Sequence, residues 1–320
     1  MRVAGIDCGT NSIRLLVADT DTRAGGGAAL KDVHREMRIV RLGQGVDATG
    51  MLAPEALERT FAAVDEYAAT IRSLGAERVR FVATSATRDA GNRDEFTEGI
   101  EARLGVEPEV VTGIEEASLS FAGAASVLPL EPGRPVLVVD LGGGSTEFVL
   151  GDADGVMAAR SVDIGCVRLT ERHLRSDPPT AAQIAAAEHD VDAAIDAVLA
   201  EVPLGRATAV VGVAGTVTTV TAHALALPEY DPALIHATEL PLDVVDAACA
   251  SLLSLTHAER AALPYMHPGR VDVIGAGALV WRRILARVAD LTGGGLRTAV
   301  TSEHDILDGI ALSTLAGRPR

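Results

Sequence analysis

Residues 3–18 read VAGIDCGTNSIRLLVA, and residues 136–151 read VLVVDLGGGSTEFVLG. Each stretch is an apolar run, a glycine-rich turn and a second apolar run, which is the pattern of two strands joined by a tight loop. The two align without a gap at a shift of 140 − 7 = 133, so that Asp7 falls on Asp140. A repeat of that length is the size of a domain and too long for a solenoid unit. The sequence therefore predicts two homologous α/β domains that face each other across a cleft.

Both glycine-rich loops have the composition of phosphate-binding turns. Glycine permits positive φ and a close approach of the backbone, and successive N–H groups in such a turn form a nest for phosphate oxygens. An aspartate closes the strand before each loop, where a carboxylate is well placed to hold Mg²⁺ through water. An ordinary flexible turn is the alternative, and the ungapped duplication argues against it. The metal candidates are Asp7 and Asp140, and the hydroxyl candidates are Thr10, Ser12, Ser145 and Thr146.

Composition limits the partners of this chain. It has 320 residues, 48% hydrophobic and 22% charged, without a run of eighteen uncharged apolar residues. These values exclude intrinsic disorder and transmembrane spans. The formal net charge is 28 − 44 = −16, and Lys31 is the single lysine. The electrostatic field of so acidic a chain repels polyanions, which excludes a broad basic surface for nucleic acid or an anionic membrane. A phosphate ligand must therefore be bound locally by amides, hydroxyls and arginines.

Cysteine and histidine usage points to a reducing compartment without a zinc site. The chain contains Cys8, Cys166 and Cys249 but no CxxC pair, which is typical of small buried residues. Its eight histidines include no HExxH or HxH pattern. The N-terminal MRVAGIDCGT leaves no room for the apolar core of a signal peptide, so we expect a cytoplasmic protein.

A third glycine-containing segment, VVGVAGTVTT at 210–219, also follows a strand-like run. As a loop it would place Gly212, Gly215 and Thr216 at the cleft. A lone GxxGT is a weak signal, and an ordinary strand-to-helix turn is an equally good interpretation.

An arginine follows the first predicted helix and the strand that comes after that helix. Segment 54–74 has apolar residues at spacings of 4, 3, 4 and 3 and is followed by Gly75, which predicts an amphipathic helix with a C-terminal stop. A strand is predicted at 78–83, and the polar residues after it include Arg88. An arginine at a strand end beside a cleft can make a bidentate phosphate contact, and a solvated surface arginine is the alternative.

Two neighbouring glutamates have different predicted roles. Residues 109–127 predict a strand, a turn and a helix, and Thr112 with Glu115 fits a capping box, which makes Glu115 structural. Glu116 has no such role, and from the first helical turn it can orient a water against a phosphorus atom. An exposed helix residue is the alternative. Glu147, on the strand leaving the second loop, competes as the base or as a metal contact, and alternation leaves its face open.

Further helices and the domain limits follow from capping signals and composition. Helices are predicted at 180–200, 243–254, 256–262, 271–290 and 304–316. Thr180 with Gln183, and Thr256 with Glu259, fit capping boxes at two of these helix starts. A junction between domains is expected at 129–135. The predicted domains are residues 1–126 plus 304–320, and residues 127–303.

Six ordered segments, including ATSATRDAGN, TGIEEASLSFAG and DIGCVRLTE, resemble the Ppx/GppA phosphatases. These are the exopolyphosphatases and guanosine pentaphosphate phosphohydrolases of the actin, Hsp70 and sugar-kinase superfamily. The resemblance extends over nearly the whole chain and implies two ribonuclease-H-like domains, with the C-terminal helix returning to the first. It also implies Mg²⁺-dependent hydrolysis of a terminal phosphoanhydride. The family's water-activating glutamate, the one before alanine in EEA, matches Glu116, and its arginine motif matches Arg88.

The family's loop residues match both glycine-rich segments. Asp7, Asp140 and Glu147 match as well, and so does Arg14, although alternation after Ser12 leaves the direction of Arg14 open. Together with the segment at 210–219, the predicted phosphate-binding residues are Gly9, Thr10, Asn11, Ser12, Gly142, Gly143, Gly144, Ser145, Thr146, Gly215 and Thr216.

Two departures from the family pattern affect the expected substrate. Many members have a stretch like GLREG near the C-terminus, whereas this chain has DILDG with Leu307 in place of the arginine. The long members carry additional helical domains, and this chain ends at Arg320. Both favour a short or nucleotide-linked phosphate over a threaded polymer, and we expect a homodimer, which would rebuild a groove.

The expected ligand is inorganic polyphosphate or guanosine pentaphosphate (pppGpp), with Mg²⁺ and without a nucleic-acid or membrane partner. Two other functions use the same loops. One is an ATP-dependent kinase of the same superfamily, in which 210–219 would cradle adenosine. The other is a non-catalytic sensor that binds guanosine tetra- or pentaphosphate.

Overall fold

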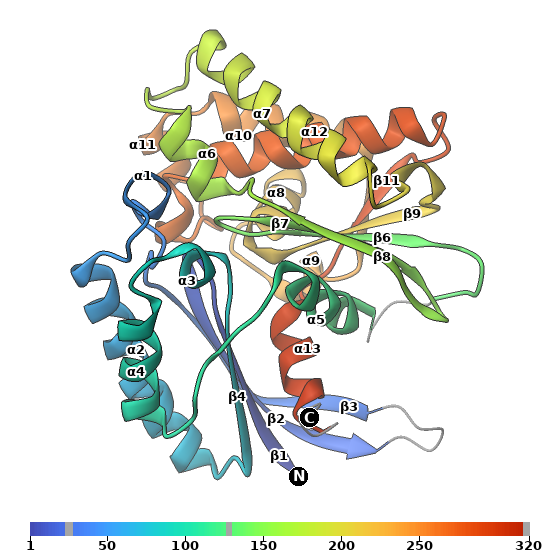
Figure 1. Ribbon diagram of the computed structural model, residues 1–320. Helices are drawn as coiled ribbons and strands as arrows, with labels where there is room; N and C mark the ends of the chain where they lie inside the picture. The colour runs from blue at the N-terminus through green and yellow to red at the C-terminus, as the bar shows by residue number, and fades with distance from the viewer. Residues whose placement is uncertain (23–27, 126–129, 316–320) are drawn as a thin grey trace. The chain divides into compact units, whose positions relative to one another are not determined.

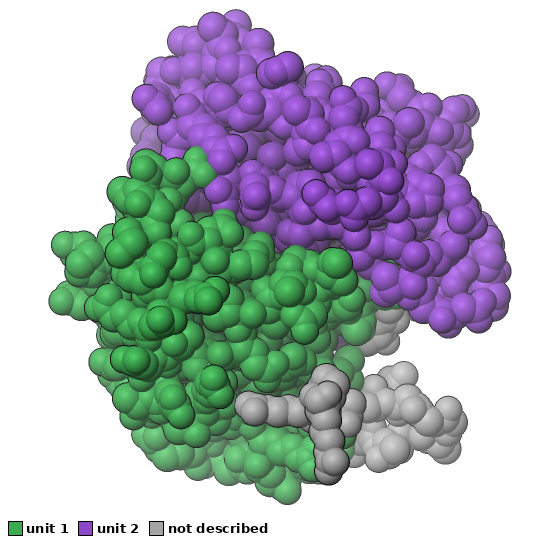
Figure 2. Space-filling model, viewed as in Figure 1, with its two compact units in different colours: residues 1–127, 305–320 green, residues 128–304 purple. Residues whose placement is uncertain are grey.

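The computed structural model describes residues 1–22, 28–125 and 130–315. The chain divides into two compact units, coloured separately in Figure 2: unit 1 is Met1–Val127 with Asp305–Arg320, and unit 2 is Leu128–His304. Each unit has its own sheet and its own hydrophobic core. The domain limit expected between 126 and 127 lies outside the described residues.

The sheet of unit 1 has the strand order β3-β2-β1-β4-β5. The first three strands form an antiparallel meander, and β4 and β5 continue the sheet in parallel with β1. The inner strand β1 is buried along nearly its whole length, as expected of an apolar strand covered on both faces. The strands are β1 (Arg2–Cys8), β2 (Ser12–Thr22), β3 (Ala28–Ile39), β4 (Arg78–Ala83) and β5 (Glu109–Val110).

The sheet of unit 2 repeats this topology. Its order is β10-β11-β9-β6-β7-β8, in which β8-β7-β6 is the antiparallel meander and β9 and β11 run parallel to β6 and to each other. The strands are β6 (Val136–Leu141), β7 (Thr146–Asp152), β8 (Gly155–Val162), β9 (Ala209–Val213), β10 (Thr238–Pro241) and β11 (Thr298–Thr301). The prediction of two ribonuclease-H-like α/β domains is confirmed, with β10 added at one edge.

Helices cover both faces of the unit 1 sheet. In Figure 1, α2 and α4 run side by side along one face, and α5 and α13 lie against the other. Phe96 and Ile100 of α4 join the core between α2 and the sheet. The helices of unit 1 are α1 (Val46–Thr49), α2 (Pro54–Leu74), α3 (Ser85–Asp89), α4 (Arg93–Leu104), α5 (Gly113–Ala125) and α13 (Ile306–Ser313).

The predicted capping boxes of unit 2 are present at Thr180 with Gln183 and at Thr256 with Glu259. The fully buried Trp281 lies on α12 in the core. The helices of unit 2 are α6 (Cys166–Arg172), α7 (Ala181–Leu199), α8 (Ala214–Ala224), α9 (Pro232–Ile235), α10 (Leu242–Ser254), α11 (His257–Ala261) and α12 (Ile274–Leu291), with 3₁₀ turns at Leu204–Arg206 and Pro268–Arg270.

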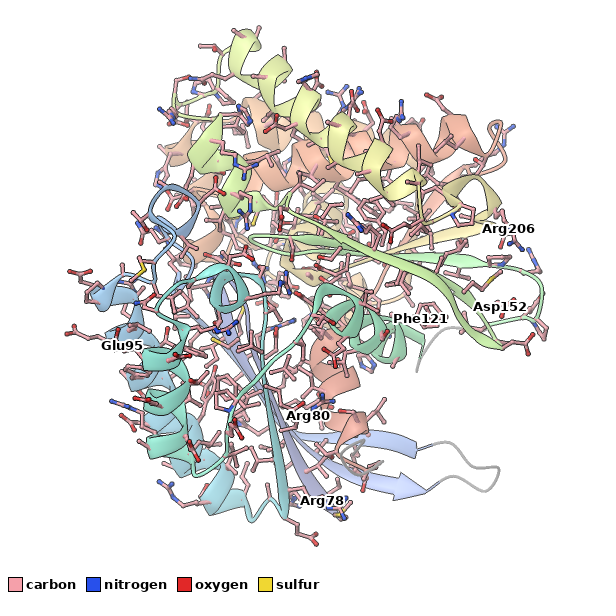
Figure 3. All side chains as sticks on the ribbon, in the orientation of Figure 1. Arg78, Arg80, Glu95, Phe121, Asp152 and Arg206 are labelled. Atoms are coloured by element: carbon pink, nitrogen blue, oxygen red, sulfur yellow. The ribbon has the colours of Figure 1, made fainter. Side chains whose placement is uncertain are left out.

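The C-terminal helix α13 belongs to unit 1, as the family resemblance implies. Two arginines of β4, labelled in Figure 3, hold its end: Arg78 donates to the Thr314 carbonyl over 2.8 Å, and Arg80 donates to Ser313 Oγ over 2.6 Å. Asp305 caps the other end of the helix. The fold thus brings the last described residues of the chain against its first strands.

Candidate active site

The first glycine-rich loop joins β1 to β2 in unit 1. The N–H of Gly9 donates to the Ser12 carbonyl over 3.0 Å, which closes the turn. The Thr10 carbonyl accepts the N–H of Gly43, and the Asn11 carbonyl accepts the N–H groups of the two residues after β3. Within the described part of the chain, the N–H groups of Thr10 and Asn11 make no hydrogen bond. The loop therefore has N–H donors available for an anion, which a phosphate-binding nest requires.

The second glycine-rich loop joins β6 to β7 in unit 2 and has the same internal bond. The N–H of Gly142 donates to the Ser145 carbonyl over 3.0 Å. The carbonyl of Gly142 accepts the N–H of Cys166 over 3.1 Å, and that of Gly143 accepts the N–H of Val167 over 2.9 Å. The first residues of α6 thus donate hydrogen bonds to the carbonyls of this loop.

Two of the loop glycines do not use the left-handed backbone that glycine permits. Neither Gly9 nor Gly142 adopts positive φ. A Cβ on Gly142 would lie 3.0 Å from the Ser145 carbonyl oxygen, so space within the turn is the constraint. Among the residues that the structure describes, the N–H groups of Gly143, Gly144 and Ser145 have no hydrogen-bond acceptor.

The side chains of the loops have distinct surroundings. Thr10 Oγ1 lies 2.9 Å from Ser85 Oγ, at the start of α3. The side-chain oxygen of Asn11 is buried and is without a hydrogen-bond partner within the structure described. Thr146 is fully buried, and its hydroxyl donates to the Ile164 carbonyl over 2.7 Å. The expectation that Thr146 offers its hydroxyl to phosphate was therefore wrong, because a carbonyl inside unit 2 already takes that proton.

Arg88 and Glu116 form an ion pair in unit 1. Nη1 of Arg88 donates to Glu116 Oε2 over 3.0 Å and to the Val111 carbonyl over 3.2 Å. The Glu116 side chain is 8% exposed and that of Arg88 is 25% exposed. Because α3 contains both Ser85 and Arg88, it connects the first glycine-rich loop to Glu116.

The predicted capping box at the start of α5 is confirmed. Thr112 receives the N–H of Glu115 on its hydroxyl, and Glu115 Oε2 accepts the Thr112 N–H over 3.0 Å. Glu115 therefore has the structural role, and the buried Glu116 has the ion pair.

Arg14 lies between two carboxylates of unit 1. It faces Asp7 across β1 and β2, with Nη2 2.6 Å from Asp7 Oδ2, and Nη1 donates to Asp305, the cap of α13. Burial raises the pKa of the Asp7 carboxyl above its ordinary value, and the Arg14 guanidinium opposes that rise. Strand register thus settles the direction of Arg14, which sequence alternation left open. It also places a cation where a metal ion at Asp7 was expected.

In unit 2, the position that corresponds to Arg14 is occupied by a residue of opposite charge, Glu147. Glu147 faces Asp140 across β6 and β7, and the shift of 133 places Glu147 on Arg14, since 147 − 133 = 14. Directly opposed residues of an antiparallel pair project on the same face, so the two carboxylates are neighbours. Both residues are buried, and Glu147 Oε1 accepts a hydrogen bond from Ser161 over 2.6 Å.

The two carboxylates of unit 2 form a candidate pair of ligands for Mg²⁺. Mg²⁺ is commonly held by one or two carboxylates and completes its shell with water and substrate phosphate. In the described ranges there is no cluster of three or more His, Cys, Asp or Glu side chains suited to a metal. A site built from Asp140 and Glu147 would therefore need phosphate oxygens and water as its other ligands.

The third glycine-containing segment is not a loop. Strand β9 ends at Val213 and α8 begins at Ala214, whose φ of 70° makes the abrupt change of direction. Thr216 packs against Gly277 of α12, where a Cβ on Gly277 would lie 2.5 Å from Thr216 Oγ1. Gly215 packs on the guanidinium of Arg270. The strand-to-helix interpretation was correct, and helix packing accounts for these small residues.

Other predicted features have structural roles. The three cysteines are free and buried, as expected. Leu307 is buried in a cluster with Val3 and Leu16, so an apolar contact replaces the arginine of the GLREG pattern. Sequence reasoning assigned no role to Asp305, the partner of Arg14, or to Arg168, whose Nε donates to the Gly144 carbonyl over 2.8 Å. The GCVR stretch after the second loop is the signal that marks Arg168.

Two ribonuclease-H-like units, each with a glycine-rich loop rich in available amides, define a phosphate-handling protein of the two-domain α/β class. The model of the Ppx/GppA phosphatase family matches residues 17–306. Exopolyphosphatase 2 of Mycobacterium tuberculosis is 52% identical over 321 residues, which cover 99% of each chain. A guanosine-5'-triphosphate,3'-diphosphate pyrophosphatase of Vibrio atlanticus is 34% identical over 178 residues, 56% of this chain and 34% of that protein. The crystal structure of an exopolyphosphatase-like protein matches 98% of each chain with a TM-score of 0.91 and 48% identity.

The chain belongs to the Ppx/GppA phosphatase family and is a phosphoanhydride hydrolase. None of the helices that the structure describes is both long enough and apolar enough to cross a membrane.

Proposed function

We propose that this protein removes the terminal phosphate of inorganic polyphosphate in a Mg²⁺-dependent hydrolysis. The observation that carries the proposal is the Arg88–Glu116 pair, which α3 connects to the amides of the first glycine-rich loop. A buried carboxylate beside a guanidinium supplies a base for water and a cation for the phosphoryl group. The full-length similarity to exopolyphosphatase 2 favours polyphosphate as the substrate.

In the proposed mechanism the first glycine-rich loop and Arg88 position the terminal phosphoryl group. The N–H groups of residues 10–11 donate to its oxygens, and Arg88 adds a charge-assisted donor. In unit 2, the N–H groups of residues 143–145 are donors for substrate phosphate. Glu116 accepts a proton from the attacking water, which adds to phosphorus as the bond to the leaving phosphate oxygen breaks. Positioning and charge stabilisation account for most of the catalysis in such a transfer.

Asp140 and Glu147 are the residues we assign to Mg²⁺. When bound, Mg²⁺ neutralises phosphate oxygens and stabilises the charge of the leaving group. The Ser161 hydroxyl holds one oxygen of Glu147 and thereby orients its carboxylate. Asp7, which pairs with Arg14, is the alternative metal ligand.

A second candidate substrate is pppGpp, because the similarity to the Vibrio pyrophosphatase covers 56% of this chain. The deciding experiment is phosphate release by purified protein with Mg²⁺ on short polyphosphate, long polyphosphate and pppGpp, side by side. We expect turnover of polyphosphate, with short chains preferred. If the protein hydrolysed pppGpp faster than polyphosphate, pppGpp would be the substrate instead.

Two other outcomes would overturn the proposed hydrolysis. Stoichiometric ADP formation that requires an acceptor would identify a kinase. Tight guanosine nucleotide binding by folded protein without turnover of any of the three substrates would identify a sensor.

A further inference from the structure

Helix α6 fixes the direction of the amides in the second glycine-rich loop. A peptide group is planar, so the carbonyl of one residue and the N–H of the next point in opposite directions. The carbonyls of Gly142 and Gly143 are bound by backbone N–H groups of α6. The N–H groups of Gly143 and Gly144 must therefore point away from α6, and they are two of the three donors without an acceptor in the described structure.

The third peptide group of the loop is held in a different way. The Gly144 carbonyl accepts a hydrogen bond from Nε of Arg168 over 2.8 Å. Because the peptide group is planar, this contact also sets the direction of the Ser145 N–H. The Arg168 side chain is 12% exposed, and Nη2 lies 3.8 Å from the exposed Asp163. The backbone N–H of Arg168 also donates to the Gly143 carbonyl over 3.2 Å.

The close fit of α6 against the loop supports a positioning role. Gly165, which precedes the helix, leaves no space for a side chain, because a Cβ there would lie 2.4 Å from the Gly143 carbonyl oxygen. Glycine at 144 has no side chain to restrict rotation of the peptide group that follows it. That peptide group is therefore the one whose direction depends on an arginine side chain.

We propose that Arg168 is a positioning residue for phosphate binding, which holds the 144–145 peptide group so that the Ser145 N–H stays available to donate to a substrate phosphate. This inference rests on the proposed function of the loop. Arg168 acts through the Gly144 carbonyl, and its loss lets that peptide group rotate. The loop then loses one of three consecutive donors to an anion.

The test compares Arg168→Ala and Arg168→Lys with the control Arg172→Ala, which removes an arginine one turn later on α6, 3.9 Å from Asp190. Orthophosphate is the probe, through its inhibition constant in the phosphate-release assay and through direct binding by calorimetry. We expect Arg168→Ala to weaken phosphate binding about tenfold or more, the effect of losing one hydrogen bond to a charged group. KM should rise by a similar factor with a smaller change in kcat, and Arg172→Ala should behave as wild type.

Chemical rescue separates positioning from general stability. Low millimolar guanidinium should restore phosphate affinity to Arg168→Ala and should leave the wild type and Arg172→Ala unchanged. Arg168→Lys, which keeps a cationic donor, should be intermediate, and it provides the measurement should the alanine variant not fold. If Arg168→Ala folds and binds phosphate as tightly as the wild type does, the proposal is overturned. If the alanine variant does not fold, wild-type phosphate binding by Arg168→Lys overturns it. Failure of the wild type to release or bind phosphate would instead overturn the proposed function.

Discussion

Arg88 Nη1 donates to Glu116 Oε2 over 3.0 Å, although 28 residues separate the two in the chain. This contact joins a residue of α3 to the first turn of α5, and the carboxylate is 8% exposed. The adjacent Glu115 is instead tied to Thr112 at the start of the same helix. Two consecutive glutamates therefore provide a matched pair of variants, one for the proposed chemistry and one for the helix cap.

Replacing Glu116 with Gln should lower kcat for phosphate release at least a hundredfold, because a positioned general base contributes at least that factor. The amide keeps the size of the side chain, so circular dichroism and the melting temperature should stay close to wild type. Glu115→Gln should retain activity and lose a small part of the stability of α5. If Glu116→Gln released phosphate at near the wild-type rate, Glu116 would not be the base.

Removal of one carboxylate from the Asp140–Glu147 pair should raise the Mg²⁺ concentration needed for half-maximal activity. We expect a shift of about ten- to a hundredfold for Asp140→Asn or Glu147→Gln, because each removes a charged ligand from a two-carboxylate site. The measurement is a Mg²⁺ titration of phosphate release. Asp7→Asn is the control and should leave the midpoint near wild type, and a larger shift in that variant would move the metal to unit 1.

Asp7→Asn should leave the free energy of unfolding at neutral pH equal to that of the wild type or slightly above it. Burial raises the pKa of Asp7, so as pH rises above 3.8 the unfolded chain releases its proton first and the folded state loses stability. The asparagine removes that cost, and Arg14 keeps its partner Asp305. Urea denaturation at neutral pH measures the change. A loss of several kcal/mol would mean that the Asp7–Arg14 pair is a net stabilising contact.

His223 should make unit 2 less stable at mildly acidic pH. Its ring is half-buried between the Tyr265 hydroxyl and Ser251 Oγ, and burial lowers its pKa below 6.5. Below 6.5 the unfolded chain binds a proton that the folded state does not, so stability falls as pH falls. His223→Gln should therefore lose less on acidification from pH 7.5 to 5.5, by about 1–2 °C in melting temperature. The exposed His189→Gln is the control, and an equal slope in all three proteins would contradict the prediction.

The parts of the fold that depend on local chemistry were predictable. The apolar runs on either side of each glycine-rich loop produced the two hairpins, and their ungapped alignment predicted the duplication that the two strand orders confirm. The amphipathic helix at 54–74 has the predicted bounds. Capping boxes at Thr112, Thr180 and Thr256 were predictable because both partners lie within four residues of each other.

The sequence supplies candidate site residues, but it does not supply the partners of their side chains. Alternation along a strand cannot choose a face without the register of its neighbour, and register is what places Arg14 against Asp7 and Glu147 beside Asp140. The segment at 210–219 is the end of β9 and the start of α8, whose small residues pack against α12 and Arg270, which the local GxxGT pattern does not contain.

The duplicated strand–loop–strand units, the helix caps and the capping role of Glu115 all follow from the sequence alone, since they rest on contacts between near neighbours. The tertiary structure decided which charges meet. Arg14 reaches Asp305 across 291 positions, and Arg168 holds the Gly144 carbonyl from another element. Such contacts depend on how strands and helices pack, so only the folded units show that Arg14 faces Asp7 while Glu147 faces Asp140.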